Sequence, residues 1–506
     1  MGVPGNANAL LLKQAAAAAG GYQISRSVRF NSSDSGFLSR LFSSGNRKTF
    51  TFNCWIKRAS LAASSQVVFG TGDAGTNNNG LAIRFNSSHQ LEVYDFGVSF
   101  NLELCATQVF RDVSSWGHLL VSIDTTQATA SNRVKIFWNG SQITTFSTAT
   151  YPSQNLDLLA NYARNHSIGR GGDFDGIYFN GLLADVFLID SQALDPTSFG
   201  EFDTNGVWQP IEYTGTFGTN GFHLPFSDNS TAAALGTDTS GNGHTWTVNN
   251  LSVTAGAGND SLVDSPTNYG TDTGAGGTVR GNYCTWNPLI NGDTAANGNL
   301  DVTNDTARGT QKLLEYDAYW EITSTGGTTT AGIVSDGGTT NTTTVANGKT
   351  YGFKLSAAGS LEYINITDGG SFTSITTGLT GIQFPYASAA SATTGSLNAG
   401  QRPFAATAPS GFKALCTTNL PEGTITTSGT FTGNANANGP FVWLNGVPTA
   451  MTINGNAVTF ATHADKLSNG FKVRTSSGSY NTAGSNTYSI STTGAKFKYA
   501  RAQANP

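Results

Sequence analysis

Charged residues are scarce in this sequence of 506 residues. Lys, Arg, Asp and Glu make up 12 % of it, about half of the roughly 25 % that is usual, and the net charge is −5. Without a basic excess the chain has no electrostatic footprint for nucleic acid, so we exclude nucleic-acid binding. No apolar run approaches the ~18 residues that cross a bilayer, which excludes membrane insertion. The stretch from Ala7 to Gly20 is interrupted by Lys13 and Gln14, so we predict no secretory signal peptide.

Motifs of catalysis and of metal binding by Cys or His are missing as well. The four cysteines lie far apart without a CxxC pair, so the sequence predicts neither a zinc site nor a disulfide framework. The six histidines are scattered, and no HExxH or GxSxG motif occurs. The GKT of Gly348–Thr350 is not a phosphate-binding loop, because Thr343 stands where a glycine is required. We therefore predict no catalytic residues and no enzyme activity.

Glycine, small polar residues and aromatic residues are abundant instead. Gly accounts for 61 of the 506 residues, and Phe, Tyr and Trp together for 11 %. Combined with Thr, Ser and Asn, this mixture favours short strands and tight turns over long helices, and the aromatic content is sufficient for packed cores. The length exceeds that of one compact domain. The composition predicts an all-β protein built from several β-sandwich domains.

From Tyr22 onward, apolar residues alternate with polar ones at a period of two. In the run Lys48–Arg58, Phe50 and Phe52 share one face, whereas Trp55 lies on the other. Comparable runs, separated by turns rich in Gly, Asn and Ser, are Gln66–Gly70, Gly80–Phe85, Gln90–Phe96, His118–Asp124, Arg133–Trp138 and Gly181–Asp190. Many short strands with such turns are typical of a sandwich or jelly roll. Only residues 1–21 have a helical pattern, which predicts a short N-terminal helical arm.

Residues 22–250 resemble the laminin-G-like or concanavalin-like lectin module. The matching motifs, in the order of that family, are FTFNCWIKR, WGHLLVSID opening at Trp116, RVKIFWNGSQI with its Asn139-Gly140 hairpin, and FNGLLADVFLIDSQAL with the strand Gly181 to Ile189. The stretch Phe222–Trp246 is similar to the closing strand of the family and its D-x-SGNG loop. The resemblance implies a jelly roll over residues 22–250.

Residues 281–422 resemble the SPRY-type sandwich found in virion proteins of tailed bacteriophages, many of them marine. The resemblance rests on YWE at Tyr319–Glu321, on the glycine strand around Gly332, on YGF at Tyr351–Phe353 and on the long tail from Phe384 to Pro421. It implies a second β-sandwich over these residues.

Two further segments complete the predicted organisation. Residues 251–280 are rich in Gly, Ser, Thr and Ala without hydrophobic periodicity, which predicts a linker or an extended loop. Residues 423–506, with FVWLNG and KFKYARA, are similar to the small β module that closes the same phage proteins. The resemblance implies a C-terminal β module there.

Two Gly-rich loops carry candidate calcium ligands. Asp173 and Asp175 lie two residues apart in GRGGDFDGIYFNG, and Asp238 and Asn242 belong to the D-x-SGNG loop. Oxygen ligands from such loops suit Ca²⁺, and the lectin-like resemblance implies Ca²⁺ in a comparable loop. The alternative is a hydrated turn in which the aspartates accept backbone amides, and both interpretations stay open.

Trp55 and Trp138 are candidates for stacking on a sugar ring. Aromatic side chains recognise the apolar face of a sugar at low cost in entropy. Trp55 is out of phase with the apolar face of its strand, and Trp138 adjoins a hairpin turn, so both are expected to be exposed. The alternative is that each is a core residue.

The phage resemblance implies a structural protein of the virion, made in the host cytoplasm. Its type is that of a tail fibre or tail spike that attaches to the host surface, usually as a homotrimer. The implied partners are other virion proteins of the tail or capsid and a glycan or protein of the host surface. Two alternatives stay open: a capsid decoration or head-fibre protein, and a depolymerase of surface polysaccharide.

Overall fold

The computed structural model describes residues 21–421 except for short gaps at 63, 73–78, 173–175, 204–205 and 292–294, and from residue 428 to 501 it describes the backbone of the strands alone. Residues 1–20 of the predicted helical arm lie outside the described residues. The described regular structure is almost entirely β, which confirms the all-β prediction. It includes one α-helix, α1 (Pro288–Asn291), and short 3-10 turns at Ser32–Asp34, Ala130–Asn132, Pro196–Ser198, Ala233–Gly236 and Thr417–Asn419. No helix of this described part is long and apolar enough to cross a membrane.

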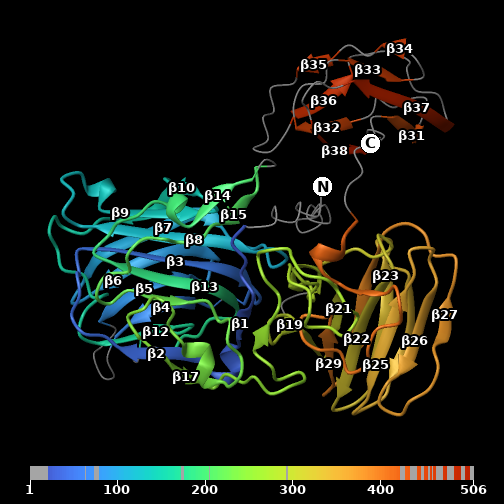
Figure 1. Cartoon of the computed structure of the whole chain (residues 1–506), viewed down its shortest axis with the longest axis horizontal. Coiled ribbons are helices and arrows are strands. Elements are labelled where there is room, and N and C mark those ends of the chain that lie inside the picture. Colours follow the sequence, from blue (N-terminus) through green and yellow to red (C-terminus); the bar gives the residue numbers. More distant parts are fainter. Residues whose placement is uncertain are drawn as a thin grey trace. The chain divides into compact units, whose positions relative to one another are not determined.

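The chain divides into two compact units. The first comprises Met1–Glu201 and Trp208–Leu420, and the second comprises Phe202–Val207 and Pro421–Pro506. The first unit contains two β-sandwiches, each made of two facing sheets (Figure 1). The strands of the first sandwich lie between Ser27 and Leu262, and those of the second between Ala295 and Ala414.

The first sandwich consists of two eight-stranded sheets. In sheet 1 the strand order is β10 (Ser141–Ile143), β9 (Val134–Trp138), β8 (Gly117–Asp124), β3 (Thr49–Arg58), β13 (Gly181–Asp190), β1 (Ser27–Phe30) and β18 (Ser261–Leu262), with β16 (Phe222–Leu224) paired to β13. In sheet 2 it is β11 (Phe146–Thr150), β7 (Phe100–Val109), β6 (Gln90–Phe96), β5 (Gly80–Phe85), β4 (Gln66–Thr71), β12 (Asn165–Ile168), β2 (Phe37–Leu41) and β17 (Thr247–Asn249). A hairpin of β14 (Gly200–Phe202) and β15 (Trp208–Pro210) lies outside both sheets.

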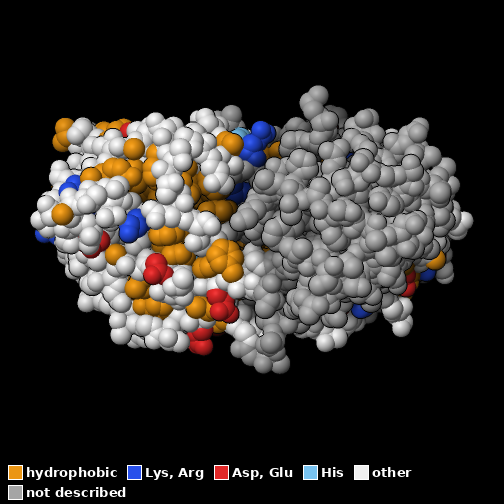
Figure 2. All heavy atoms as spheres, turned by 90° about the horizontal axis from the view of Figure 1, so that it is seen from above, with side chains coloured by type: hydrophobic (Ala, Val, Ile, Leu, Met, Phe, Trp, Pro, Cys, Tyr) orange, Lys and Arg blue, Asp and Glu red, His pale blue; other side chains and the backbone are white. Residues whose placement is uncertain are grey.

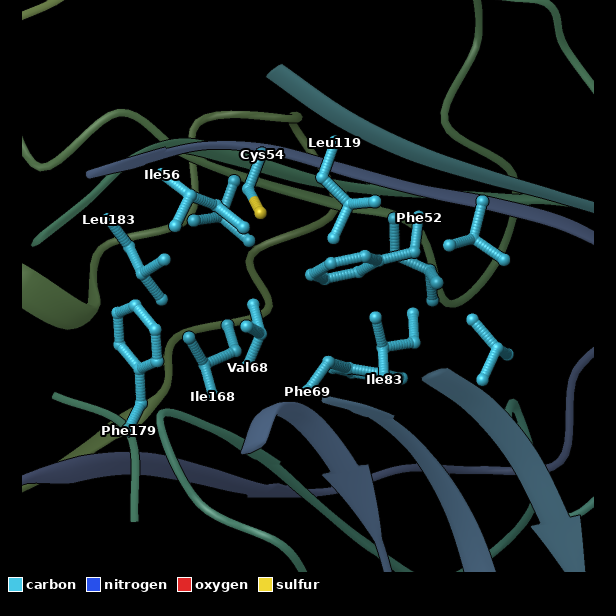
Figure 3. Close-up of a cluster of buried hydrophobic side chains, with 14 of the residues drawn as sticks. Phe52, Cys54, Ile56, Val68, Phe69, Ile83, Leu119, Ile168, Phe179 and Leu183 are labelled. Carbon is cyan, nitrogen blue, oxygen red and sulfur yellow. The ribbon is translucent and has the colours of Figure 1, made fainter. Parts of the chain in front are cut away.

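The core of the first sandwich lies between sheets 1 and 2. Figure 3 shows Phe52, Cys54 and Leu119 of sheet 1 opposite Phe69 and Ile83 of sheet 2. The rings of Phe52 and Phe69 stack with centroids 4.7 Å apart. Burying such a side chain stabilises the fold by about 1.5–3 kcal/mol, so the period-two pattern of the strands sets which face turns inward.

The second sandwich is smaller and pairs one long sheet with one short sheet. Sheet 3 has the order β19 (Ala295–Ala296), β20 (Asp301–Thr303), β29 (Thr394–Asn398), β22 (Ala318–Thr325), β25 (Thr350–Leu355), β26 (Leu361–Asn365) and β27 (Thr373–Thr376), with β30 (Lys413–Ala414) parallel to β22. Sheet 4 has the order β21 (Thr306–Arg308), β28 (Gln383–Ala389), β23 (Thr329–Ser335) and β24 (Thr340–Val345). Its core centres on Trp320, which stacks on Phe353 at 5.7 Å.

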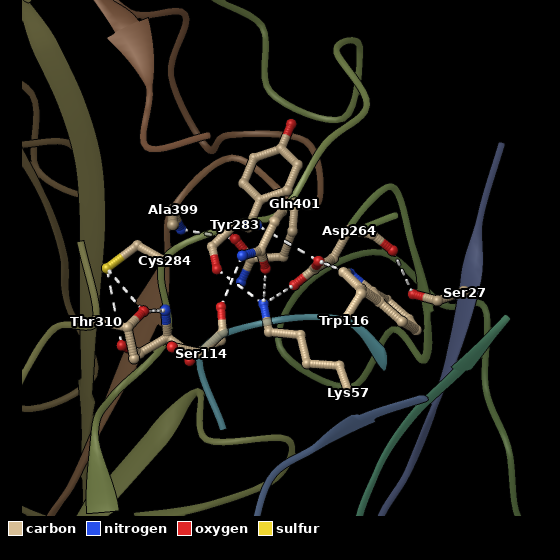
Figure 4. A network of polar contacts seen from close by, with 12 residues as sticks. Ser27, Lys57, Ser114, Trp116, Asp264, Tyr283, Cys284, Thr310, Ala399 and Gln401 are labelled. Carbon is tan, nitrogen blue, oxygen red and sulfur yellow. Dashed lines mark hydrogen bonds and ion pairs between the residues drawn. The ribbon is translucent and has the colours of Figure 1, made fainter. Parts of the chain in front are cut away.

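Residues 251–280, where the sequence predicts a linker or an extended loop, are packed between the two sandwiches. Strand β18 pairs with β1, and the side chains of Asp260 and Asp264 are buried. The buried Lys57 ammonium of β3 donates to Asp264 at 2.7 Å and to the backbone oxygen of Tyr283 at 2.9 Å (Figure 4). The indole N–H of Trp116 donates to the second oxygen of Asp264 at 2.9 Å. The low hydrophobicity of residues 251–280 did not indicate this packing, because these contacts are made by polar groups.

The described strands of the C-terminal part form two four-stranded sheets. One has the order β31 (Ser428–Gly433), β37 (Gly484–Ser491), β33 (Ala450–Ile453) and β34 (Asn456–Ala457), and the other β35 (Phe460–Thr462), β36 (Phe471–Thr475), β32 (Phe441–Asn445) and β38 (Lys496–Arg501). All the neighbouring strands in both sheets are antiparallel.

Candidate functional site

The outward face of sheet 2 carries a group of aromatic residues on β6 and β7. Leu91 and Val93 of β6 point into the core, so Glu92, Tyr94 and Phe96 fall on the opposite face of the strand. We call Arg84, Glu92, Tyr94, Phe96 and Phe100 the aromatic face. The register of the sheet brings its members together: Arg84 is opposite Glu92, and Phe96 is opposite Phe100.

The aromatic face has a buried floor and an exposed rim. Tyr94 is 7 % exposed, whereas Phe100 is 44 % exposed. The ring of Phe100 meets the rings of Tyr94 and Phe96 edge to face, with centroid distances of 6.0 and 5.0 Å. Such edge-to-face pairs are favourable and hold the rings at defined angles.

Arg84 and Glu92 pair with each other on the aromatic face, and Glu103 of β7, opposite Tyr94 on the same outward side, adds a further carboxylate. The Nε of Arg84 donates to Glu92 at 2.6 Å, and the guanidinium lies 4.7 Å from the centroid of the Tyr94 ring. Since the cation and the carboxylate neutralise each other, this pair offers hydrogen-bonding atoms without a net field. On the face of the molecule seen in Figure 2, few of the described side chains are charged, in keeping with the 12 % of Lys, Arg, Asp and Glu in the sequence.

A buried carboxylate fixes the hairpin that presents the exposed rim. Asp95 accepts hydrogen bonds from the side-chain amide of Asn101 at 3.0 Å and from the backbone N–H of Leu159 at 2.6 Å. Burial raises the pKa of the Asp95 carboxyl, and these two donors oppose that effect. Gly97 closes the turn by donating to the carbonyl of Ser99 at 3.0 Å. The hairpin tip, and with it Phe100, is therefore held by contacts on both strands.

The segment that carries two of the candidate calcium ligands adjoins the aromatic face. Ile177 packs against Tyr94, and a Cβ added to Gly70 of β4 would lie 2.8 Å from the carbonyl oxygen of Arg170. The chain on either side of Asp173 and Asp175 thus lies on the outward face of sheet 2. These two residues themselves lie outside the described residues.

The other pair of candidate calcium ligands is saturated by the protein. The Asp238 carboxylate accepts the backbone N–H groups of His223, Ser240 and His244 at 2.8–2.9 Å. Burial opposes ionisation, but these donors prevail and leave the pKa of Asp238 below its ordinary value. Asn242 donates to two backbone carbonyls. This geometry matches a turn in which the aspartate accepts backbone amides, and calcium binding at Asp238 and Asn242 stays a prediction. Among the described residues no cluster of three His, Cys, Asp or Glu is arranged to hold a metal ion.

The expected exposure of the two tryptophans is wrong for Trp55 and only partly met for Trp138. Trp55 is 4 % exposed, because Trp208 and Ile24 cover the outward face of sheet 1 above it. Trp138 is half-buried, and its indole packs against the core ring of Phe110 with centroids 4.8 Å apart. A strand in the middle of a sheet can have both faces covered, so being out of phase with one core does not imply exposure.

Comparison with known families gives the first sandwich its class. Residues 31–198 match the family model described as the Concanavalin A-like lectin/glucanases superfamily. This part of the chain has a lectin-like fold. None of the curated protein sequences compared with the chain matches it.

Solved structures show low overall similarity. The heptameric SAP-like pentraxin of Limulus polyphemus is 15 % identical, with a TM-score of 0.26. The aligned part covers 34 % of this chain and 79 % of the pentraxin chain. The TRIM65 PSpry domain is 12 % identical, with a TM-score of 0.20. The aligned part covers 23 % of this chain and 92 % of that domain. Tailspike protein 2 of the Escherichia coli O157:H7 bacteriophage CAB120 is 12 % identical, with a TM-score of 0.24. The aligned part covers 34 % of this chain and 23 % of the tailspike chain. These scores assign no activity or partner to the chain.

Sequence reasoning missed the aromatic face of the lectin-like sandwich. The run Gln90–Phe96 is recognisable as a strand, and its inward residues are plain from the alternation. The alternation also places Tyr94 and Phe96 on the same outward face of this strand as Glu92, and this could have been read from the sequence. What the sequence does not show is that β7 returns beside β6 and places Phe100 against both rings.

Proposed function

We propose that the chain is a structural protein of a bacteriophage particle, of tail-fibre or tail-spike type, that binds glycan on the host surface and carries out no reaction. The observation that carries the binding part is the aromatic face of the lectin-like sandwich. The phage part is supported by the resemblance of residues 281–422 and 423–506 to virion proteins. The proposed partners are other virion proteins of the tail or capsid, in a trimeric assembly.

The chemistry of the aromatic face suits a sugar ring. The exposed Phe100 offers an apolar ring surface for the C–H groups of a pyranose, and the partly exposed Arg84 guanidinium offers donors on the same face. The Arg84–Glu92 pair is neutral and Glu103 adds one carboxylate, which favours neutral over anionic sugars and contacts bridged by water. Calcium binding at Asp173 and Asp175, whose flanking chain adjoins this face, stays a prediction.

The decisive variant removes the exposed ring. We expect Phe100→Ala to weaken binding of the full chain to its host glycan about five- to tenfold, because the stacking contact is lost while the buried floor of Tyr94 remains. Affinity electrophoresis of the purified protein through gels containing host-envelope polysaccharide measures the change. Val109→Ala is the matched control, since Val109 is 54 % exposed at the opposite end of the same strand. Equal retention of both variants and the wild type contradicts the role of the aromatic face.

The virion part of the proposal has its own test. Gold-labelled antibodies raised against the chain should decorate the tails of intact particles in electron micrographs. Labelling spread over the head shell, together with binding to empty capsids, would instead indicate capsid decoration. Shortening of the polysaccharide by the purified protein would contradict the absence of a reaction.

A further inference from the structure

The second sandwich has an outward face that the proposed function does not use. Sheet 4 turns Ala307, Ala331, Ile333 and Ala387 toward the core. The intervening residues of its four strands therefore point outward. One of these outward positions, Arg308, is charged, and most of the others carry hydroxyl groups.

Four hydroxyl residues are aligned across the whole width of sheet 4. The register places Thr306 opposite Ser388, Ser388 opposite Thr330, and Thr330 opposite Thr344. We call these four residues the hydroxyl row. Strands lie about 4.8 Å apart, so the row extends over ~14 Å. Thr330 and Thr344 are exposed, and the other two are half-buried.

In the next row of the same face, an aromatic residue is paired with a glycine. Tyr386 of β28 is opposite Gly332 of β23, and Gly332 is opposite Thr342 of β24. A Cβ at Gly332 would lie 2.2 Å from the carbonyl oxygen of Asn341, so the close approach of β24 requires glycine here. The half-buried Tyr386 ring consequently has no side chain next to it on β23.

The remaining outward residues give the face neither a net field nor an apolar surface. The Arg308 guanidinium lies 3.5 Å from the centroid of the Phe384 ring and donates to Asp336 at 3.0 Å. Phe384 and Val334 are 4 % and 7 % exposed. A partner that docks through apolar residues would find little area to bury, and an ionic partner would find its countercharge already paired.

We propose that the outward face of sheet 4 is a second carbohydrate site, which binds a neutral polysaccharide along the hydroxyl row with one sugar ring against Tyr386. Uncharged hydroxyls aligned over several strands match the hydroxyls of a neutral sugar chain, and Gly332 leaves the tyrosine without a side chain beside it on β23. The site goes beyond the proposed function, because it lies on the other sandwich and uses different residues.

The test measures retention of the full-length protein in affinity gels that contain dextran, α-mannan or β-1,3-glucan, with alginate as the anionic comparison. It is performed in the Phe100→Ala background, so that the aromatic face does not contribute. We expect Tyr386→Ala to weaken the remaining retention by a neutral polysaccharide about fivefold, and Tyr386→Phe to preserve most of it. The double variant Thr330→Val/Thr344→Val keeps the side-chain shapes and removes two hydroxyls, so it should weaken retention similarly. Thr373→Val, at an exposed position on sheet 3, is the matched control.

Three outcomes overturn this inference. The first is that wild type is retained by none of the neutral polysaccharides, or by alginate alone. The second is that Phe100→Ala by itself abolishes retention, which leaves the proposed function intact. The third is that the tyrosine and threonine variants match the control. If Phe100→Ala has no effect while Tyr386→Ala abolishes retention, the aromatic face fails and the site on sheet 4 stands.

Discussion

A buried histidine couples the stability of the first sandwich to pH. His118 of β8 is fully buried between Trp55 and Trp208, and burial lowers its pKa to about 3. The Nε1–H of Trp208 donates to its Nδ1 at 3.2 Å, which places the proton of the neutral ring on Nε2, near Asn53. The unfolded chain binds this proton at the ordinary pKa of 6.5.

The expected result follows from which state binds more protons. Between about pH 6.5 and pH 3 the unfolded state holds a proton on His118 that the folded state lacks, so stability is complete above pH 6.5 and declines as the pH falls. The contribution approaches ~1.4 kcal/mol per pH unit. We expect His118→Asn, which keeps an acceptor for Trp208, to flatten the dependence of the free energy of unfolding on pH between 4 and 6.5. Urea unfolding of both proteins at several pH values measures this, and parallel profiles would contradict it.

At the same scale, individual residues show what a sequence can reveal about a site. The inward residues of the strands were predictable, since each alternates with polar neighbours. The burial of Trp55 was not predictable, because the residues that cover it, Ile24 and Trp208, are distant from it in the sequence. Asp238 was recognised as a loop residue with two possible roles, and only the positions of the surrounding N–H groups distinguish them.

At the scale of the element, residues 251–280, for which the composition predicts a linker or an extended loop, make backbone hydrogen bonds and buried polar contacts. The backbone N–H of Arg280 donates to Tyr269, and the N–H of Tyr269 donates back to Arg280. Polar residues here satisfy the backbone of both sandwiches, so low hydrophobicity does not indicate a free chain. The composition shows only that apolar residues are few in this segment, and these backbone hydrogen bonds cannot be read from it.

A protease distinguishes the two interpretations of this element. Arg280 is the single Lys or Arg between residues 251 and 280. Since its backbone is paired, we expect native protein to be cut after Arg280 at least about tenfold more slowly than after the exposed Arg111. Mass spectrometry of a trypsin time course gives both rates within one sample, and urea-unfolded protein should show comparable rates. Early release of two native fragments divided at Arg280 would indicate a linker after all.

At the scale of the whole molecule, polar contacts of Lys57 form a junction between the two sandwiches of the first unit, and we expect the sandwiches to unfold together. Lys57 is 1 % exposed, and its ammonium binds Asp264, Asn282 and the backbone of Tyr283 in the chain that leads into the second sandwich. An apolar cluster of Leu182, Leu262 and Leu300 adds to the same junction.

Removing one partner of the buried pair tests this coupling. Lys57→Met leaves the Asp264 carboxylate buried without its cation, which costs about 3–5 kcal/mol. If the sandwiches unfold together, the variant lowers the midpoint of one shared calorimetric transition, and hydrogen exchange accelerates in β22 and β25 of the second sandwich as well as in β5 and β6 of the first. Lys354→Met is the matched control: its partner Glu362 is 3.0 Å away in a more exposed pair, whose loss should cost no more than about 1 kcal/mol. Two results would contradict this coupling. One is hydrogen exchange that accelerates only in the first sandwich, and the other is a second transition of the Lys57→Met protein at the wild-type midpoint. Either would show that the two sandwiches are stable independently.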